Sequence, residues 1–300
     1  MTLSGSGASR ATPLLPASPP SPGRSLTGLS SKIRETRYSR LLAKRILASL
    51  SSPAPHSEES CSSRRKHCSR RRKCGGCLVS SPEKVWKILR DGNERLTKGT
   101  PTHPSQDADR RTAIAAQQTP IAALFGCSDS RISAEIIFDV GLGELFVVRN
   151  AGHIVSDSVL ASLEYAVEVL GVSVVVVLAH DDCGALHAAI ERDAGEQTNY
   201  PPKVAKLVTQ LQPAIERTRL ALAETTNESL TADAVAGQHL KDTLARLLAG
   251  SELLGQKIAD GRLGLVGARY RLVEGLVQPE VMVGNLGQDD GFAKPASLDS

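Results

Sequence analysis

The chain has 300 residues, of which 41% are hydrophobic and 3% aromatic, and its formal net charge is +4. This length suffices for one or two domains with a buried core. The longest apolar run lies near residues 172–179, far short of the roughly 20 residues that a membrane-spanning helix needs. The N-terminus also lacks the apolar segment of a secretory signal, so we expect neither a membrane span nor secretion.

Charge divides the chain into two parts. Residues 1–80 hold 15 of the 36 Lys and Arg but only 3 of the 32 Asp and Glu, so the remainder is acidic. The first part is rich in Ser, Pro, Gly and Arg, and we expect a disordered basic extension with at most a short helix over residues 39–50. Three interpretations stay open: a start site assigned upstream of the natural one near residue 78, an organellar targeting segment, or a nucleic-acid-binding segment.

Cysteine usage indicates the compartment. Four of the six cysteines lie in residues 1–80, and only Cys127 and Cys183 lie in the remainder. A disulfide scaffold would distribute its cysteines through the fold, so we expect a reducing compartment, the cytoplasm.

An ordered domain is expected over residues 81–284, followed by a flexible tail over residues 285–300. Ser81 and Pro82 predict a helix start, and the apolar spacing extends this helix to about Lys98, with Trp86 at the edge of its apolar stripe. The further predictions are helices at 110–118, 132–140, 156–170 and 184–193, interrupted helices at 203–224 and 231–259, and strands at 121–126, 144–150, 172–179 and, last, 263–272. This alternation predicts an α/β fold with a mostly parallel β-sheet flanked by helices.

Polar motifs follow two of the predicted buried strands. Cys127, Asp129 and Arg131 lie in CSDSR, and His180 and Cys183 lie in AHDDCGA. Ligands of open α/β sheets bind beyond the carboxyl ends of the strands, and two thiolates with one imidazole suit zinc. Three protein ligands leave a fourth position open, as in catalytic sites. We therefore predict that Cys127, His180 and Cys183 bind a catalytic zinc ion.

Asp129 and Arg131 occupy alternate positions of the turn and can face the same site. We predict that Arg131 pairs with Asp129, lowers its pKa and fixes its orientation. The plain alternative is a surface ion pair of little energetic weight. Each zinc motif alone also has a plain explanation, a small buried cysteine or a core histidine, and the combination of the two favours zinc.

The segments CSDSR, FVVRNAG (146–152) and HDDCGA (180–185), in this order and spacing, resemble the β-class carbonic anhydrases. The resemblance extends from about Pro82 to Leu272, is nearest to actinobacterial members, and leaves residues 1–80 without a counterpart. It implies a homodimer, often paired into a homotetramer, with the N-terminal helix packing on the partner subunit. It also implies reversible hydration of CO2 to bicarbonate and a proton by zinc-bound hydroxide, with one Zn2+ per subunit.

The resemblance further implies the roles of individual residues. Asp129 and Arg131 are the catalytic dyad beside the zinc ligands. Gln118 hydrogen-bonds substrate, Phe146 forms an apolar wall of the CO2 pocket, and Tyr165 is lent by the neighbouring subunit. Gly184 is placed with these substrate-binding residues. Two positions depart from the family pattern without removing a ligand: Ala179 replaces a usual Gly, and Asp181 replaces a frequent Ser.

Three alternative functions remain. One keeps the fold and hydrolyses COS or CS2. Another is a zinc-containing nucleic-acid-binding protein that acts through SSRRKHCSRRRKCGGC, residues 62–77. The last is a structural or redox zinc protein, against which the dyad argues because a structural site takes a fourth protein ligand. The expected partners are CO2 or bicarbonate and further copies of the chain, and neither a membrane nor nucleic acid is expected.

Overall fold

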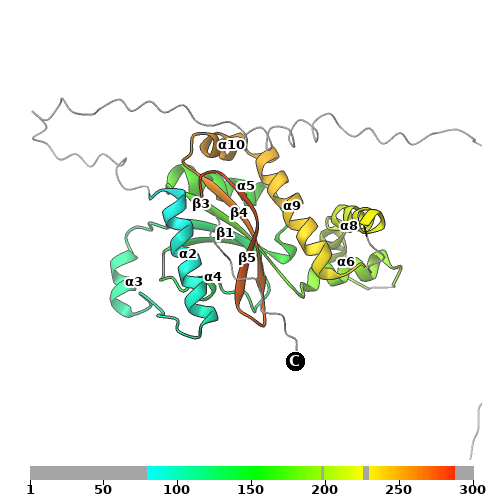
Figure 1. Ribbon diagram of the computed structural model, residues 1–300, viewed down its shortest axis with the longest axis horizontal. Coiled ribbons are helices and arrows are strands. Elements are labelled where there is room, and N and C mark those ends of the chain that lie inside the picture. Colours follow the sequence, from blue (N-terminus) through cyan, green and yellow to red (C-terminus); the bar gives the residue numbers. More distant parts are fainter. Residues whose placement is uncertain (1–79, 197–198, 226–229, 288–300) are drawn as a thin grey trace, which may run out of the picture. The chain divides into compact units, whose positions relative to one another are not determined.

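The computed structural model describes residues 80–196, 199–225 and 230–287 (Figure 1). The basic extension and the C-terminal tail, apart from Ser80 and residues 285–287, lie outside the described residues. Within them, one five-stranded sheet has the strand order β2-β1-β3-β4-β5. Four strands are parallel, as predicted, and the fifth is antiparallel. The strands are β1 (Ala122–Cys127), β2 (Leu145–Asn150), β3 (Val174–His180), β4 (Gly264–Arg271) and β5 (Leu276–Val283).

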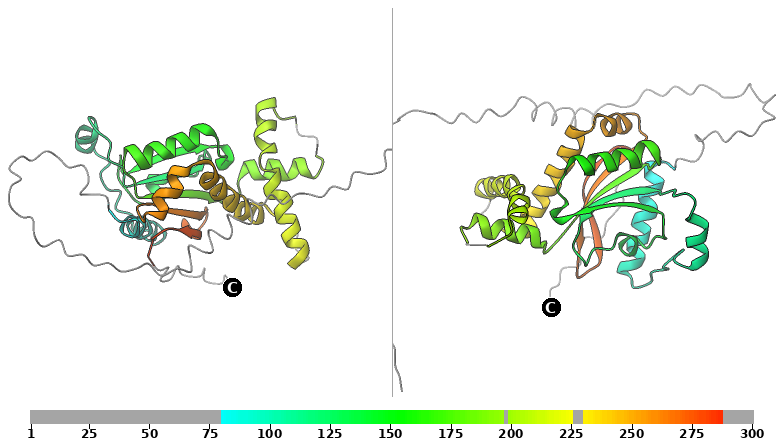
Figure 2. Two further views of the ribbon diagram at one scale, coloured as in Figure 1. Left: turned by 90° about the horizontal axis from the view of Figure 1, so that it is seen from above. Right: turned by 180° about the vertical axis from the view of Figure 1, so that it is seen from behind.

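Both faces of the central strand β3 are buried, which explains its continuous run of valines. Val174 and Val176 face one apolar cluster with helices α2 (Pro82–Thr97) and α4 (Ala134–Ile137). Val175 and Val177 face a second cluster with α5 (Asp157–Glu164) and α9 (Ala232–Gly250). Helices therefore cover both sides of the sheet, as the two views of Figure 2 show.

Helix α2 begins where the sequence predicts. The Ser81 hydroxyl accepts a hydrogen bond from the Lys84 amide at 3.4 Å, and Pro82 is the first helical residue. Its buried face differs from the prediction, because Trp86 is 1% exposed whereas Ile88 is 45% exposed. The tryptophan therefore belongs to the centre of the apolar stripe rather than its edge.

Other helix boundaries shift for local reasons. Helix α3 (Ala108–Ile114) begins two residues before the predicted segment because the Asp107 carboxylate caps the Arg110 amide at 2.7 Å. The predicted helix 132–140 shortens to the single turn α4. The predicted helix 156–170 is α5 continued by the π-helical turn η2 (Tyr165–Val169), and it ends at Gly171 with φ 73°.

The strand 263–272, predicted as the last, is followed by β5, so that prediction was wrong. β5 pairs antiparallel with β4 after the turn at Gly275, which has φ 66°. Its Pro279 lacks the N–H that a central strand would use, and an edge strand tolerates this loss. The proline and the mixed polarity of Leu276–Val283 conceal the strand in the sequence.

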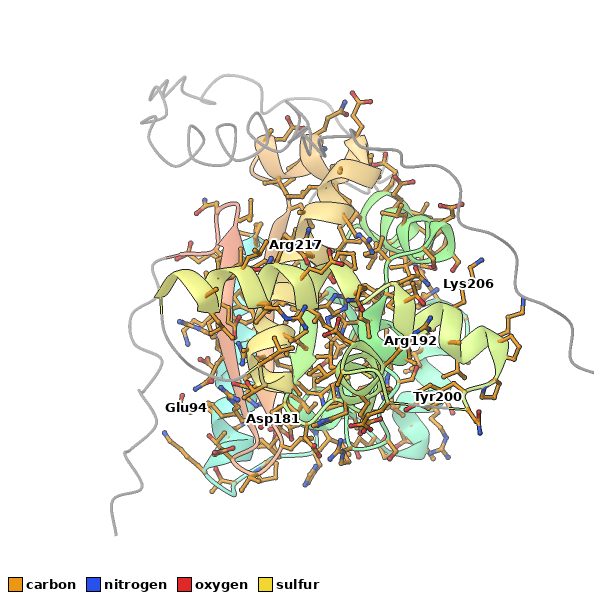
Figure 3. All side chains as sticks on the ribbon, turned by 90° about the vertical axis from the view of Figure 1, so that its right-hand side faces the viewer. Glu94, Asp181, Arg192, Tyr200, Lys206 and Arg217 are labelled. Atoms are coloured by element: carbon orange, nitrogen blue, oxygen red, sulfur yellow. The ribbon has the colours of Figure 1, made fainter. Side chains whose placement is uncertain are left out.

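Three further helices lie together after the carboxyl end of β3, namely α6 (Gly184–Asp193), α7 (Pro202–Thr209) and α8 (Gln212–Thr225). Helix α10 (Glu252–Ala259) instead precedes the amino end of β4, and its Leu254 packs in the second apolar cluster. The helix predicted over 203–224 is interrupted between Thr209 and Gln212, and Pro213 occupies the first turn of α8, where its missing N–H costs nothing. Arg192 of α6 donates to the Ala205 carbonyl at 2.8 Å, which joins α6 to α7 (Figure 3). None of the helices in the described ranges is long and apolar enough to cross a bilayer.

Candidate metal centre

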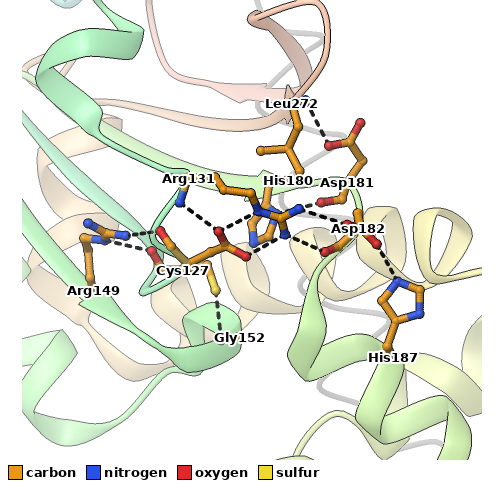
Figure 4. Close-up of polar contacts among 10 residues, drawn as sticks. Cys127, Arg131, Arg149, Gly152, His180, Asp181, Asp182, His187 and Leu272 are labelled. Atoms are coloured by element: carbon orange, nitrogen blue, oxygen red, sulfur yellow. Dashed lines mark hydrogen bonds and ion pairs between the residues drawn. The ribbon is translucent and has the colours of Figure 1, made fainter.

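Strand pairing brings the two sequence motifs together. β1 and β3 are neighbouring parallel strands, with Gly126 paired to Leu178, so their carboxyl ends lie side by side. Cys127 ends β1, His180 ends β3, and Cys183 is the N-cap of α6. All three residues are buried, and their ligand atoms lie within 4.8 Å of one another. Figure 4 shows two of them, Cys127 and His180, side by side. The three predicted ligands therefore share one small volume.

The His180 ring offers one particular nitrogen to this volume. Its Nδ1 lies 2.7 Å from the Asp181 carbonyl oxygen. A carbonyl only accepts, so Nδ1 holds the proton and Nε2 keeps its lone pair. This buried Nε2 has no hydrogen-bond partner within the described ranges, which would cost about 1–3 kcal/mol if nothing bound there. A neutral imidazole oriented through its other nitrogen is the usual form of a zinc ligand.

The two cysteines behave as a coupled pair. Hydrogen bonding from Cys183, the adjacent His180 ring and the Gly152 and Asp129 amides together lower the pKa of the Cys127 thiol to about 4, although burial opposes this shift. The same hydrogen bond, with burial, raises the pKa of Cys183, although the amides of Leu186 and Ala185 at the start of α6 also donate to it. Together the two cysteines hold a concentrated negative charge, and a divalent cation releases the remaining proton. Two sulfurs and one imidazole form a donor set that fits zinc.

Beside this cluster, Arg131 grips Asp129 with two side-chain nitrogens. Nε donates to Oδ1 at 2.9 Å and Nη2 donates to Oδ2 at 2.7 Å, while the Arg131 amide also donates to Oδ1 at 2.9 Å. These hydrogen bonds hold the pKa of Asp129 well below its usual range. The predicted contact between the two side chains is thus present, and the carboxylate stays ionised and immobile.

A second carboxylate holds Arg131 from the other side. Asp182 accepts from Nη1 of Arg131 at 2.9 Å, and its carbonyl accepts from Nη2 at 3.0 Å. His187 lies 3.0 Å from the other oxygen of Asp182. The neighbouring Asp181 turns away and accepts from the Leu272 amide beyond β4 at 3.0 Å. Only one of the two aspartates after His180 therefore faces the dyad.

Sequence reasoning missed two residues that shape the turn after β1. Arg149 donates from Nε to the Cys127 carbonyl at 2.8 Å and from Nη2 to the Asp129 carbonyl at 2.6 Å. Gly152 donates its amide to Cys127 Sγ at 3.4 Å, and its φ of 71° is left-handed. Both lie in FVVRNAG, where an arginine inside an apolar strand and the glycine after it were the available signals.

The predicted substrate-binding residues occupy three places. Gly184 directly follows Cys183, and a Cβ there would meet no described atom within 4 Å apart from its chain neighbours and the backbone of its own helix. Phe146 on β2 contacts Tyr165 of the same chain, with ring centroids 6.1 Å apart, and Tyr165 is 44% exposed. Gln118 lies exposed in the loop between α3 and β1.

Comparison with known proteins places this geometry in a family. The family model described as carbonic anhydrase matches residues 122–277. Carbonic anhydrase 2 of Mycobacterium tuberculosis is 42% identical over 211 residues, which cover 70% of this chain and 98% of that protein. The carbonic anhydrase of Mycolicibacterium smegmatis is 41% identical over 210 residues, with the same coverage.

Solved structures agree on the fold. The β-carbonic anhydrase CcaA superposes with a TM-score of 0.51 at 23% identity, covering 64% of this chain and 93% of that one. The β-carbonic anhydrase CafA of Aspergillus fumigatus gives 0.50 at 22% identity, covering 68% and 92%. Together with the mycobacterial relatives, these matches show that the chain belongs to the β-class carbonic anhydrases, in its actinobacterial branch.

Proposed function

We propose that this carbonic anhydrase hydrates CO2 reversibly to bicarbonate and a proton, with zinc held by Cys127, His180 and Cys183. One observation carries the assignment of these ligands: two sulfurs converge at the strand ends with an imidazole nitrogen that has no hydrogen-bond partner among the described residues. Zinc bound there supplies a Lewis acid that makes water available as a nucleophile near neutral pH. The protein must then orient that water and keep the open position free.

The Asp129–Arg131 dyad performs these two tasks. An ionised carboxylate only accepts hydrogen bonds, so Asp129 takes an O–H of the attacking water and directs a lone pair toward CO2. The two-nitrogen grip of Arg131 prevents this carboxylate from moving to the cation as a fourth ligand. Asp182 and Arg149 support the arrangement by fixing Arg131 and the backbone of the turn.

The substrate side is assigned to the remaining predicted residues. The open space at Gly184, next to Cys183, supports a place for CO2 or bicarbonate near the cation. Gln118 donates to the bicarbonate oxygens that develop during the reaction. Phe146 forms an apolar wall of the CO2 pocket, and Tyr165 is contributed to the pocket of a neighbouring subunit. The contact between the two rings within one chain supports a place for both at the same subunit boundary.

We assign a homodimer or homotetramer as the working form. Exposed apolar side chains support a subunit contact, namely Ile88 on α2 and Tyr165 and Val169 on η2, which are 44–63% exposed. We also place the protein in the cytoplasm, because Cys127 and Cys183 are close to one another yet form no disulfide within the part of the chain that the structure describes, which favours reducing conditions.

Stopped-flow CO2 hydration by the full chain, with zinc measured on the same sample, tests the proposal. We expect stoichiometric zinc and rapid hydration that Asp129→Asn abolishes. Asp242→Asn is the matched control, because Asp242 is 17% exposed and paired with an arginine, as Asp129 is 16% exposed and paired with Arg131. A zinc-loaded protein without hydration at alkaline pH would contradict the proposal, and COS and CS2 would then be assayed.

A further inference from the structure

Two buried histidines, His153 and His239, lie behind the zinc ligands and have no part in the reaction described above. They are 1% and 4% exposed, and their ring centroids are 4.4 Å apart. His153 belongs to the short turn η1 (Ala151–His153) after β2, whereas His239 lies on α9. Burial lowers the pKa of both histidines, so the pair is neutral at the pH of catalysis.

Two hydrogen bonds of Gly152 link His239 to the metal site. Its Nε2 lies 2.8 Å from the Gly152 carbonyl oxygen, and the Gly152 amide donates to Cys127 Sγ at 3.4 Å. The carbonyl only accepts, so Nε2 of His239 is the donor and holds the ring proton. Gly152 is therefore anchored on one side by α9 and presents its N–H to a ligand sulfur on the other.

The geometry of this segment requires such an anchor. Gly152 has φ 71° and the next residue, His153, has φ 39°, a left-handed conformation that is unfavourable for a residue with a side chain. A Cβ on Gly152 would lie 3.2 Å from the Ala185 Cβ, so the peptide passes close to α6. Strained backbone persists only where its surroundings enforce it, and the His239 hydrogen bond holds the strained turn.

We propose that His239 is a positioning residue that holds the Gly152 N–H on Cys127 Sγ and thereby tunes the zinc site. This inference rests on the proposed function of Cys127 as a zinc ligand. A hydrogen bond to a thiolate withdraws electron density from the sulfur, so the bound cation remains a stronger Lewis acid. The His153 ring packs against the His239 ring and fixes its orientation. The His153 ring is in turn held edge-on to Phe125, with ring centroids 6.3 Å apart.

A purely structural role would be filling the core between α9 and the sheet. Substitutions of His239 that keep or remove the N–H donor distinguish this core-filling role from the positioning role. His239→Gln keeps an N–H donor of similar reach, His239→Leu fills space without a donor, and His239→Phe keeps a ring against His153 without a donor. Thr243→Val is the matched control, because Thr243 lies one turn further along α9, is 1% exposed, and its hydroxyl has no hydrogen-bond partner in the described part of the chain.

The test uses the full-length protein loaded with zinc or with Co2+, whose thiolate charge-transfer absorption reports on the metal–sulfur bonds. We expect His239→Leu and His239→Phe to shift this absorption and to move the pH midpoint of kcat/KM upward, because Cys127 then donates more charge to the cation. Cation binding should weaken about 10- to 100-fold, because Gly152 no longer fixes the position of Cys127. His239→Gln should restore all three, and Thr243→Val should change none.

A folded His239→Leu or His239→Phe protein with wild-type absorption, cation affinity and pH midpoint would overturn the proposal. The absorption and cation affinity are measured without turnover. A wild-type protein that fails to hydrate CO2, but whose absorption still shifts in His239→Leu, would therefore refute the proposed function and leave the role of His239 standing.

Discussion

Replacing Arg131 by Gln removes the two side-chain hydrogen bonds that orient Asp129 and leaves the backbone one in place. The lost contacts are Nε to Oδ1 at 2.9 Å and Nη2 to Oδ2 at 2.7 Å. Hydrogen bonds to charged groups contribute about 1.5–3 kcal/mol each. Arg131 is 45% exposed, so solvent screening reduces the strength of both hydrogen bonds well below this range. We therefore expect kcat/KM for CO2 hydration to fall about 10-fold, since 1.4 kcal/mol corresponds to a factor of ten.

The pH dependence of this loss distinguishes orientation from charge. Arg131 holds the pKa of Asp129 below its usual range, and in the variant that pKa returns toward the ordinary value of about 3.9. Asp129 thus remains ionised at any pH of the assay. The loss in kcat/KM should then be the same at neutral and alkaline pH, because only the orientation of the carboxylate has changed.

Arg217→Gln provides the matched control. Arg217 is 49% exposed and Asp242 is 17% exposed, so the two arginine–aspartate pairs are alike in burial. In both pairs the arginine donates from Nε and Nη2, although Arg217 places both donors on one oxygen of Asp242. Stopped-flow hydration and urea unfolding are measured on both variants. Unchanged kcat/KM in Arg131→Gln, or an equal loss in Arg217→Gln, would refute the orienting role of the dyad.

Further predictions concern metal retention and stability. Cys183→Ser should remain folded by circular dichroism but lose zinc on dialysis, because it removes a thiolate ligand; retained stoichiometric zinc would exclude Cys183 as a ligand. The Asp139 side chain is fully buried and accepts hydrogen bonds from three neighbouring residues. Asp139→Ala should therefore lower the free energy of unfolding, measured in urea, by about 3–5 kcal/mol. Asp91→Ala, at a side chain that is 44% exposed, should lower it by under about 1 kcal/mol. These hydrogen bonds outweigh burial and lower the pKa of Asp139. The stabilisation by Asp139 is therefore complete above the unfolded-state pKa of about 3.9 and is lost as the pH falls toward the lower native pKa. A difference in unfolding free energy between wild type and Asp139→Ala that is the same at pH 7 and at pH 3 would contradict this. A Cβ on Gly92 would lie 1.7 Å from a backbone oxygen, but one on Gly255 meets nothing within 4 Å, so Gly92→Ala should prevent folding while Gly255→Ala raises the unfolding free energy by about 0.5–1 kcal/mol.

Much of the metal centre follows from local sequence, because each ligand lies at or just after the end of a buried strand. A run such as Val174–Ala179 predicts its own burial, and the polar residues after it must then lie at the sheet edge. The pairing of Asp129 with Arg131 follows in the same way from alternate positions in one turn. Sequence reasoning succeeds there because the residues that interact are near neighbours or extend adjacent strands.

The features that escaped prediction depend on distant contacts. His239 approaches Gly152 across 87 residues of sequence, and no local pattern on α9 distinguishes it from a core histidine. β5 is stabilised by its pairing with β4 rather than by a strong strand pattern of its own. Helix α3 begins early because of one capping aspartate, a signal that was present at Asp107 but that the periodicity of residues 110–118 overshadowed.

The placement of the ligands on β1 and β3 also determines when zinc can bind during folding. These strands pair directly although β2 and four helical segments (α4, η1, α5 and η2) separate them in the chain, so the site assembles only after a long loop has closed. A folding transition state that lacks this pairing gains nothing from the metal. We therefore predict that zinc slows unfolding rather than speeding folding, so that a chain deprived of zinc reaches the same fold at the same rate but unfolds sooner.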